Sequence, residues 1–178
     1  MLAAALAGAT AAAQGLVEWR EQAIPGACIL RFAVPEGWEA DARTPAPGAV
    51  EISLVPTRGP RARVLVSGTL LRGDAALKST GDLKKAARGL GEGMLPGAVE
   101  KKIELERVDG TDGAGFFYTL TDKRPDLPEG EFRVTTQGIM AVGPLRLALT
   151  VLAPERGSAA AKMAFGLLRT AECQAARR

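Results

Sequence analysis

The polar side chains best suited to binding a partner lie in three consecutive predicted strands, residues 115–122, 131–142 and 145–153. Alternate side chains of a strand point to the same face, so each strand carries its polar members on one side. If the strand registers agree, two arginines and several hydroxyl and amide groups share one surface, and guanidinium groups bind anions well. We therefore predict a binding face for a small anionic ligand or an unidentified envelope protein, formed by Thr119, Thr121, Arg133, Thr135, Gln137 and Arg146.

The apolar residues of the same strands are expected to face the core. In this interpretation the buried side of the sheet consists of Phe116, Tyr118, Leu120, Phe132, Val134, Leu145, Leu147 and Leu149. The alternative is that the polar residues are only the solvated side of an antiparallel sheet, which commonly buries one face and exposes the other.

Catalytic chemistry has little support in the sequence. Histidine is absent, which excludes His-dependent triads and His-containing zinc sites, and two cysteines are too few for a Cys-rich zinc site. The acidic residues are dispersed, and the DGTDG stretch at 109–113 lacks most ligands of a calcium loop. We expect no metal, no cofactor and no catalytic residue. The enzymatic alternative is a small enzyme that uses arginine, threonine and carboxylate groups.

The first 13 residues are uncharged and mostly small, and they end in three alanines. This pattern predicts a signal peptide cleaved before Gln14, and hence a periplasmic or secreted protein, although the basic start of a typical signal is missing. The alternative is a short alanine-rich helix of a cytosolic protein. No other segment reaches the ~20 apolar residues of a membrane helix, so no membrane span is expected.

Cys28 and Cys173 are the two cysteines of the chain. In an oxidising compartment they would form a disulfide that joins the two ends of the domain. The alternative is a pair of buried thiols, because free cysteine is often buried.

The composition fits one folded domain. The chain has 178 residues, of which 47% are hydrophobic and 24% charged. Its net charge of +3 is small and its basic residues are scattered, so we expect no nucleic-acid partner. The oligomeric state is left open.

The order of predicted elements indicates an α+β fold. Strands are predicted at 28–34, 50–55 and 62–71, followed by a short or frayed helix that Ser79 caps together with Asp82. A strand at 99–108 and the three strands above come next, and Ser158 begins a final helix. This order predicts an antiparallel sheet of about seven strands packed with two main helices. The domain spans 28–173, with an extension at 14–27 and a tail at 174–178.

One short motif carries a family resemblance. Residues 32–38 follow the pattern F-x-V-P-x-G-W, in an early strand of a chain with an export-like start and a final amphipathic helix. Over residues 28–173 the chain resembles the PsbP-like superfamily, which includes the extrinsic photosystem II protein, the Ran-binding Mog protein and many bacterial envelope proteins.

The resemblance implies an α/β sandwich in which Trp38 packs against the sheet. The family has no shared catalytic machinery, so the resemblance implies an exported, non-enzymatic binding or accessory protein of the bacterial cell envelope. A chaperone for secretion effectors is the alternative if the N-terminal segment is retained.

Overall fold

The computed structural model describes residues 17–59, 61–71 and 77–175. The predicted signal peptide at 1–13 lies outside these residues. The elements follow one another along the chain as β1 (Val17–Ile24), β2 (Cys28–Pro35), β3 (Trp38–Arg43), β4 (Ala49–Pro56), β5 (Arg63–Leu70), α1 (Thr80–Glu92), the 3₁₀ turn η2 (Leu95–Gly97), β6 (Glu106–Gly110), β7 (Gly113–Thr121), β8 (Val134–Val142), β9 (Leu145–Ala153), α2 (Ala159–Thr170) and β10 (Glu172–Gln174).

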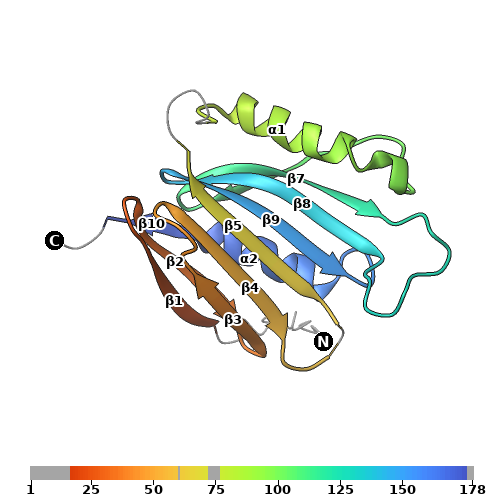
Figure 1. The fold of residues 1–178 in the computed structure, drawn as a ribbon, viewed down its shortest axis with the longest axis horizontal. Coiled ribbons are helices and arrows are strands. Elements are labelled where there is room, and N and C mark those ends of the chain that lie inside the picture. The colour runs from red at the N-terminus through yellow and green to blue at the C-terminus, as the bar shows by residue number, and fades with distance from the viewer. Residues whose placement is uncertain (1–16, 60, 72–76, 176–178) are drawn as a thin grey trace, which may run out of the picture.

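The main sheet confirms the predicted α+β class. It has seven strands in the order β3-β4-β5-β9-β8-β7-β6, and all neighbouring strands are antiparallel (Figure 1). Two meanders, β3-β4-β5 and β6-β7-β8-β9, meet where β5 pairs with β9. A second sheet of three strands has the order β1-β2-β10.

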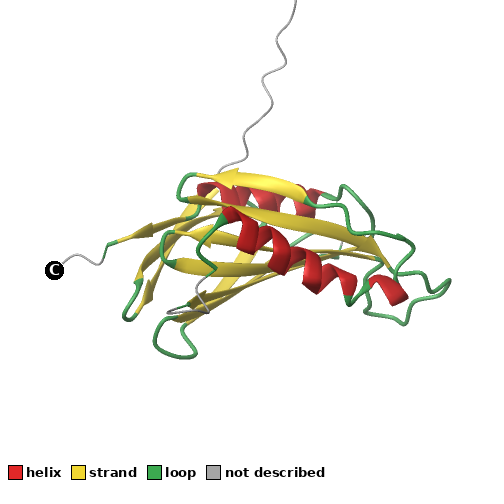
Figure 2. Cartoon of the chain, turned by 90° about the horizontal axis from the view of Figure 1, so that it is seen from above, coloured by secondary structure: helices red, strands yellow, loops and turns green. Residues whose placement is uncertain are grey.

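The two helices lie on opposite faces of the main sheet (Figures 1 and 2). α1 packs on one face over β7 and β8, where Leu83 and Ala87 contact Phe116. α2 and the small sheet pack on the other face and enclose the main core with residues such as Phe32 and Leu147. Adjacent residues of β7 therefore point into different apolar layers, since Phe117 belongs to the main core.

Helix α1 begins as the sequence predicts. Ser79 and Asp82 form a reciprocal capping box, in which the Ser79 side chain accepts from the Asp82 backbone and the Asp82 carboxylate accepts from the Ser79 backbone. Gly91 is buried against the sheet, and a Cβ there would lie 2.7 Å from Ile103. This glycine permits close packing, so α1 runs for 13 residues and the expectation of a short or frayed helix is wrong.

Several strand boundaries differ from those expected. Residues of the presumed extension at 14–27 form β1, and Trp38 begins the strand β3. The ring of Trp38 is partly buried against the main core, where the resemblance places it. The strand expected at 99–108 starts only at Glu106, and the one expected at 131 starts at Val134. β1, β3 and β6 are edge strands of mixed polarity, which makes their ends hard to predict, whereas β8 is an interior strand whose start differs by three residues.

A disulfide joins Cys28 to Cys173, as the sequence predicts. The two Cα atoms are 5.6 Å apart, and the bridge links β2 to β10, which also pair along their backbones. Cys173 lies in β10, a short strand that follows α2. Within the described part of the chain, no helix is long and apolar enough to cross a membrane.

Removing the disulfide should destabilise the protein strongly. The bridge closes a loop of 145 residues, and restricting the unfolded chain over that length contributes at most about 5 kcal/mol. We expect reduction with dithiothreitol to lower the free energy of urea unfolding by about 2–5 kcal/mol. The Cys28→Ala/Cys173→Ala variant is the control, because it should match the reduced protein and show no response to dithiothreitol. Equal stability of the oxidised and reduced protein would contradict this expectation.

Candidate functional site

A gap in the edge of the main sheet is the starting point of the candidate site. β6 pairs with β7 only as far as the pair Glu106↔Phe117. The residues leading into β6 contact β7 again at Thr121, whose carbonyl accepts a hydrogen bond from the Val99 N–H at 2.8 Å. Between these two points β7 has no strand partner on this side among the described residues, because residues 100–105 diverge from it.

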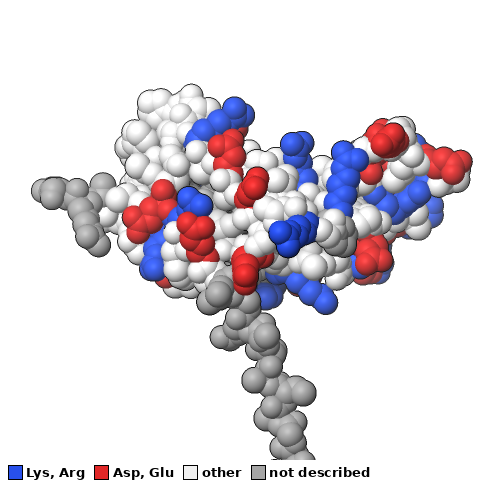
Figure 3. Space-filling view, turned by 90° about the horizontal axis from the view of Figure 1, so that it is seen from below, with Lys and Arg blue, Asp and Glu red and all other residues white. Residues whose placement is uncertain are grey.

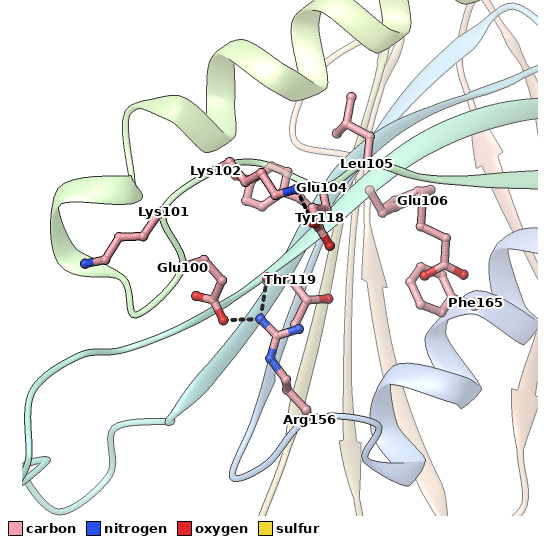
Figure 4. Close-up of a pocket in the computed structure, with 11 residues that line it drawn as sticks. Glu100, Lys101, Lys102, Glu104, Leu105, Glu106, Tyr118, Thr119, Arg156 and Phe165 are labelled. Carbon is pink, nitrogen blue, oxygen red and sulfur yellow. Dashed lines mark hydrogen bonds and ion pairs between the residues drawn. The ribbon is translucent and has the colours of Figure 1, made fainter.

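A cavity of about 870 Å³ occupies this gap (Figure 4). Its volume lies within the usual range for small-molecule pockets. The lining combines carboxylates and ammonium groups from the divergent segment with hydroxyl and aromatic groups from β7 and α2. The lining residues are Glu100, Lys101, Lys102, Glu104, Leu105, Glu106, Phe117, Tyr118, Thr119, Arg156 and Phe165.

Arg156 fills the open section of the strand edge. It lies in the connection between β9 and α2, and its guanidinium group points back across β7 (Figure 4). Nη2 donates to the carbonyl of Thr119 at 2.9 Å and pairs with Glu100, while Nε donates to the Thr121 hydroxyl at 3.2 Å. The guanidinium therefore takes the place that a backbone donor of a neighbouring strand would hold.

Glu100 completes this polar cluster. Its carboxylate accepts from the Thr121 N–H at 2.8 Å and from the Thr121 hydroxyl at 3.0 Å. Burial by itself raises the pKa of Glu100, but the hydrogen bonds from the Thr121 and Glu100 backbones and from Arg156 outweigh it, so the pKa lies below its ordinary value. At neutral pH the site therefore contains an ion pair with both partners charged.

A second hollow of about 340 Å³ adjoins the first, with which it shares Glu106, Thr119 and Phe165. Its floor includes Thr136, whose hydroxyl lies 2.8 Å from that of Thr119. Among the described residues, Thr136 is the one polar residue that is fully buried, with 3% of its surface exposed. We call the two hollows together the threonine groove, defined by Glu100, Thr119, Thr136, Arg156 and Phe165.

The predicted polar face does not exist as a single surface. The register of β7 and β8 pairs Thr119 with Thr136, and Thr121 with Val134, on the side of α2. Thr135 and Gln137 point to the opposite side. There the Tyr118 hydroxyl donates to Gln137 at 2.7 Å, and the Gln137 amide donates to Thr150 at 3.1 Å.

The expected core side is divided in the same way. Phe116, Tyr118 and Leu120 lie on the side of α1, whereas Leu147 and Leu149 belong to the main core. Alternation predicts which residues of one strand share a face. It does not tell which face of the next strand continues that layer when both faces are apolar.

Arg133 and Arg146 hold loops in place. Arg133 donates to the carbonyl of Pro125 at 2.9 Å and also to those of Asp122 and Arg124. Arg146 donates to the carbonyl of Leu77 at 2.9 Å, and to those of Gly143 and Leu145. Of the six predicted site residues, only Thr119 and Thr121 lie at the threonine groove or its polar cluster.

Arg156, Glu100 and Thr136 were missed by sequence reasoning. Glu100 and Arg156 are 56 residues apart and lie outside regular strands, where charged residues are usually only solvated. Thr136 is adjacent to the predicted Thr135, and the two side chains point to opposite faces of the strand. The alternation of side chains alone does not tell which of these faces carries the site. Only the pairing of β7 with β8 distinguishes them.

The carboxylates of Glu100 and Glu104 at the groove are ionised at neutral pH, and the phenol of Tyr118 is neutral. Hydrogen bonding and the charge of Lys102 lower the pKa of Glu104, so both Glu100 and Glu104 are ionised at neutral pH. Burial raises the pKa of Tyr118, which keeps the phenol neutral. A general acid or base functions best with a pKa near the working pH. No group of three or more His, Cys, Asp or Glu side chains able to hold a metal occurs in the described ranges.

Charges on the surface are mixed in sign. Figure 3 shows the side that carries β1 and β3, where acidic and basic side chains alternate without forming a large patch of one sign. Exposed ion pairs also occur at both edges of the main sheet, for example Arg43–Glu51 beside β3 and Arg107–Asp109 in β6. No protein-family model matches the chain, and no curated protein matches it.

Arg146→Ala should reduce stability, since it leaves the carbonyl of Leu77 without its charged donor. A hydrogen bond from a charged group contributes about 1–3 kcal/mol, and we expect a loss of that size in urea unfolding. Arg107→Ala is the matched control, because it removes an exposed arginine whose partner is two residues away, and its effect should be small. A stability loss that is equal in both variants would argue against the structural role of Arg146.

Glu100 should make stability depend on pH in the acid range. Its pKa in the folded protein lies below the ordinary value of 4.5, so its stabilising contribution is present above pH 4.5 and is lost as the pH falls through the folded-state pKa. In thermal unfolding from pH 7 to pH 2, the difference between the wild type and Glu100→Gln should be largest near neutrality and shrink in acid. A difference that is constant over this range would contradict the ion pair with Arg156.

Proposed function

We propose that this chain is an exported, non-enzymatic binding or accessory domain of the bacterial cell envelope, with a PsbP-like architecture, and that its partner binds in the threonine groove. The observation that carries the proposal is the interruption of the β7 edge, where a cavity, three hydroxyl groups and Arg156 come together. A sheet edge with free positions is a common place for a partner to add contacts.

The groove favours a partner with a carboxylate or another anionic group. Arg156 is half exposed, and among the described contacts its Nη1 takes no part in a hydrogen bond. Arginine has donors in a planar fork that suits such groups. Phe165 and Leu105 supply apolar surface beside it. The partner would therefore combine an anionic group with an apolar portion.

Export is supported by the disulfide, because such bridges persist mainly in oxidising compartments. The enzymatic alternative has less support, since the carboxylates of the groove are held ionised by basic neighbours. The chaperone alternative depends on an N-terminal segment that lies outside the described residues.

A binding experiment with two matched arginine variants tests the proposal. The immobilised protein is incubated with envelope extract, the retained proteins are identified, and the affinity of each purified candidate is measured. We expect Arg156→Gln to weaken binding of the true partner at least tenfold, and added salt to weaken the wild-type interaction. Arg107→Gln, which changes an exposed arginine that lines neither hollow, should bind as the wild type does. A partner that binds all three proteins equally would place the binding site elsewhere.

A further inference from the structure

The strand β1 has one free edge. It is the terminal strand of the small sheet, pairs only with β2 among the described strands, and is exposed over its first five residues, 17–21. In Figure 1 it lies at the outside of the molecule. An edge strand of this kind presents unpaired N–H and C=O groups that another strand can bind.

The direction of these backbone groups follows from a contact at the other end of β1. The carbonyl of Ala23 accepts a hydrogen bond from the Thr44 hydroxyl at 3.0 Å, so it points away from β2. Backbone groups of alternate residues point to the same side of a strand. Val17, Trp19 and Glu21 therefore direct their N–H and C=O groups to the free edge.

The side chains at this edge include an exposed aromatic residue. Trp19 is 41% exposed and Val17 is 50% exposed, and both lie on the outer face of the small sheet, opposite Ala33 and Pro35. The Arg31 guanidinium stacks over the Trp19 ring at 4.1 Å. This contact orients the ring and leaves part of its apolar surface available to a partner.

The charged residues on either side of Trp19, Glu18 and Arg20, are of opposite sign, so they can pair with the same residues of a second copy. Glu18 and Arg20 share the other face of β1 and are paired within the strand at 3.1 Å. In an antiparallel pair of two copies related by a two-fold axis normal to the sheet, a central residue lies opposite itself. With Trp19 at the centre, Glu18 of each copy lies opposite Arg20 of the other.

Registers centred on a charged residue are unfavourable. Centring the pair on Glu18, Arg20 or Glu21 places two like charges directly opposite each other, and such pairs are destabilising. Only the register centred on Trp19 opposes unlike charges at both flanking positions. The same register aligns Val17 with Glu21 of the other copy, so that all outward backbone groups between residues 17 and 21 find partners.

We propose that β1 is a self-association edge, at which two copies of this chain pair antiparallel with Trp19 opposite Trp19. The product is a continuous six-stranded sheet, β10-β2-β1 followed by β1-β2-β10 of the second copy. The two Trp19 rings cover each other on the outer face, and two Glu18–Arg20 ion pairs form between copies on the other. The interface is small, so association is weak and depends on protein concentration.

Complementary charge reversal tests this proposal with the full chain. Sedimentation velocity should show a monomer–dimer equilibrium for the wild type. Glu18→Lys places a lysine opposite Arg20 of the other copy, and Arg20→Glu places a glutamate opposite Glu18, so each variant alone should be monomeric. Mixed in equal amounts, the two variants should form a heterodimer, because both inter-chain pairs are then of opposite sign. Recovery on mixing also shows that neither variant had lost its fold.

Arg107→Glu is the matched control. It reverses one partner of an exposed pair two residues apart on another edge strand, β6, and should leave the dimer unchanged. A wild type that stays monomeric at high micromolar concentration would overturn the proposal. So would a dimer that survives both single variants, because it would use another surface, or a mixture of the variants that fails to associate.

Discussion

The pairing of β5 with β9 is the contact on which the rest of the fold depends. These strands come from separate meanders, yet they pair over eight residues, from Arg63↔Leu152 to Leu70↔Leu145, and join the two halves into one sheet. Close packing at this seam depends on Gly68, because a Cβ there would lie 2.5 Å from Val50 and 2.6 Å from Leu147. The seam therefore combines continuous backbone pairing with tight side-chain packing in the main core.

Once the seven strands are joined, the sheet must be covered on both faces. α2 and the small sheet cover one face, and the disulfide holds β2 and β10 of the small sheet side by side. α1 covers the other face mainly over β7 and β8. On the other side α2 contacts both β9 and β6, and its residue Phe165 lines the threonine groove. The groove therefore lies between α2 and the section of the β7 edge that β6 leaves unpaired.

Both binding surfaces proposed for this protein are places where strand pairing is incomplete. At the β7 edge, Arg156 supplies a donor to the Thr119 carbonyl and partly satisfies the open backbone. At β1, charged side chains flank the open edge, an arrangement that discourages pairing with most strands. Incomplete pairing leaves specific hydrogen-bonding groups free, and the neighbouring charges then select which partner can use them.

The sequence alone determined the class of this fold and the start of both helices, and it predicted the bridge between the two cysteines. These features depend on local signals, such as the capping box at Ser79 and the side-chain hydroxyl at Ser158, or on the small number of cysteines. Tertiary structure decided which faces of neighbouring strands coincide. Thr119 and Thr135 each lie in a strand whose polar and apolar residues largely alternate, which suggested a common polar face. The register of β7 with β8 places them on opposite sides of the sheet. Arg156 and Glu100 meet because a loop and a divergent segment converge on one edge, and strand or helix periodicity carries no information about such convergence.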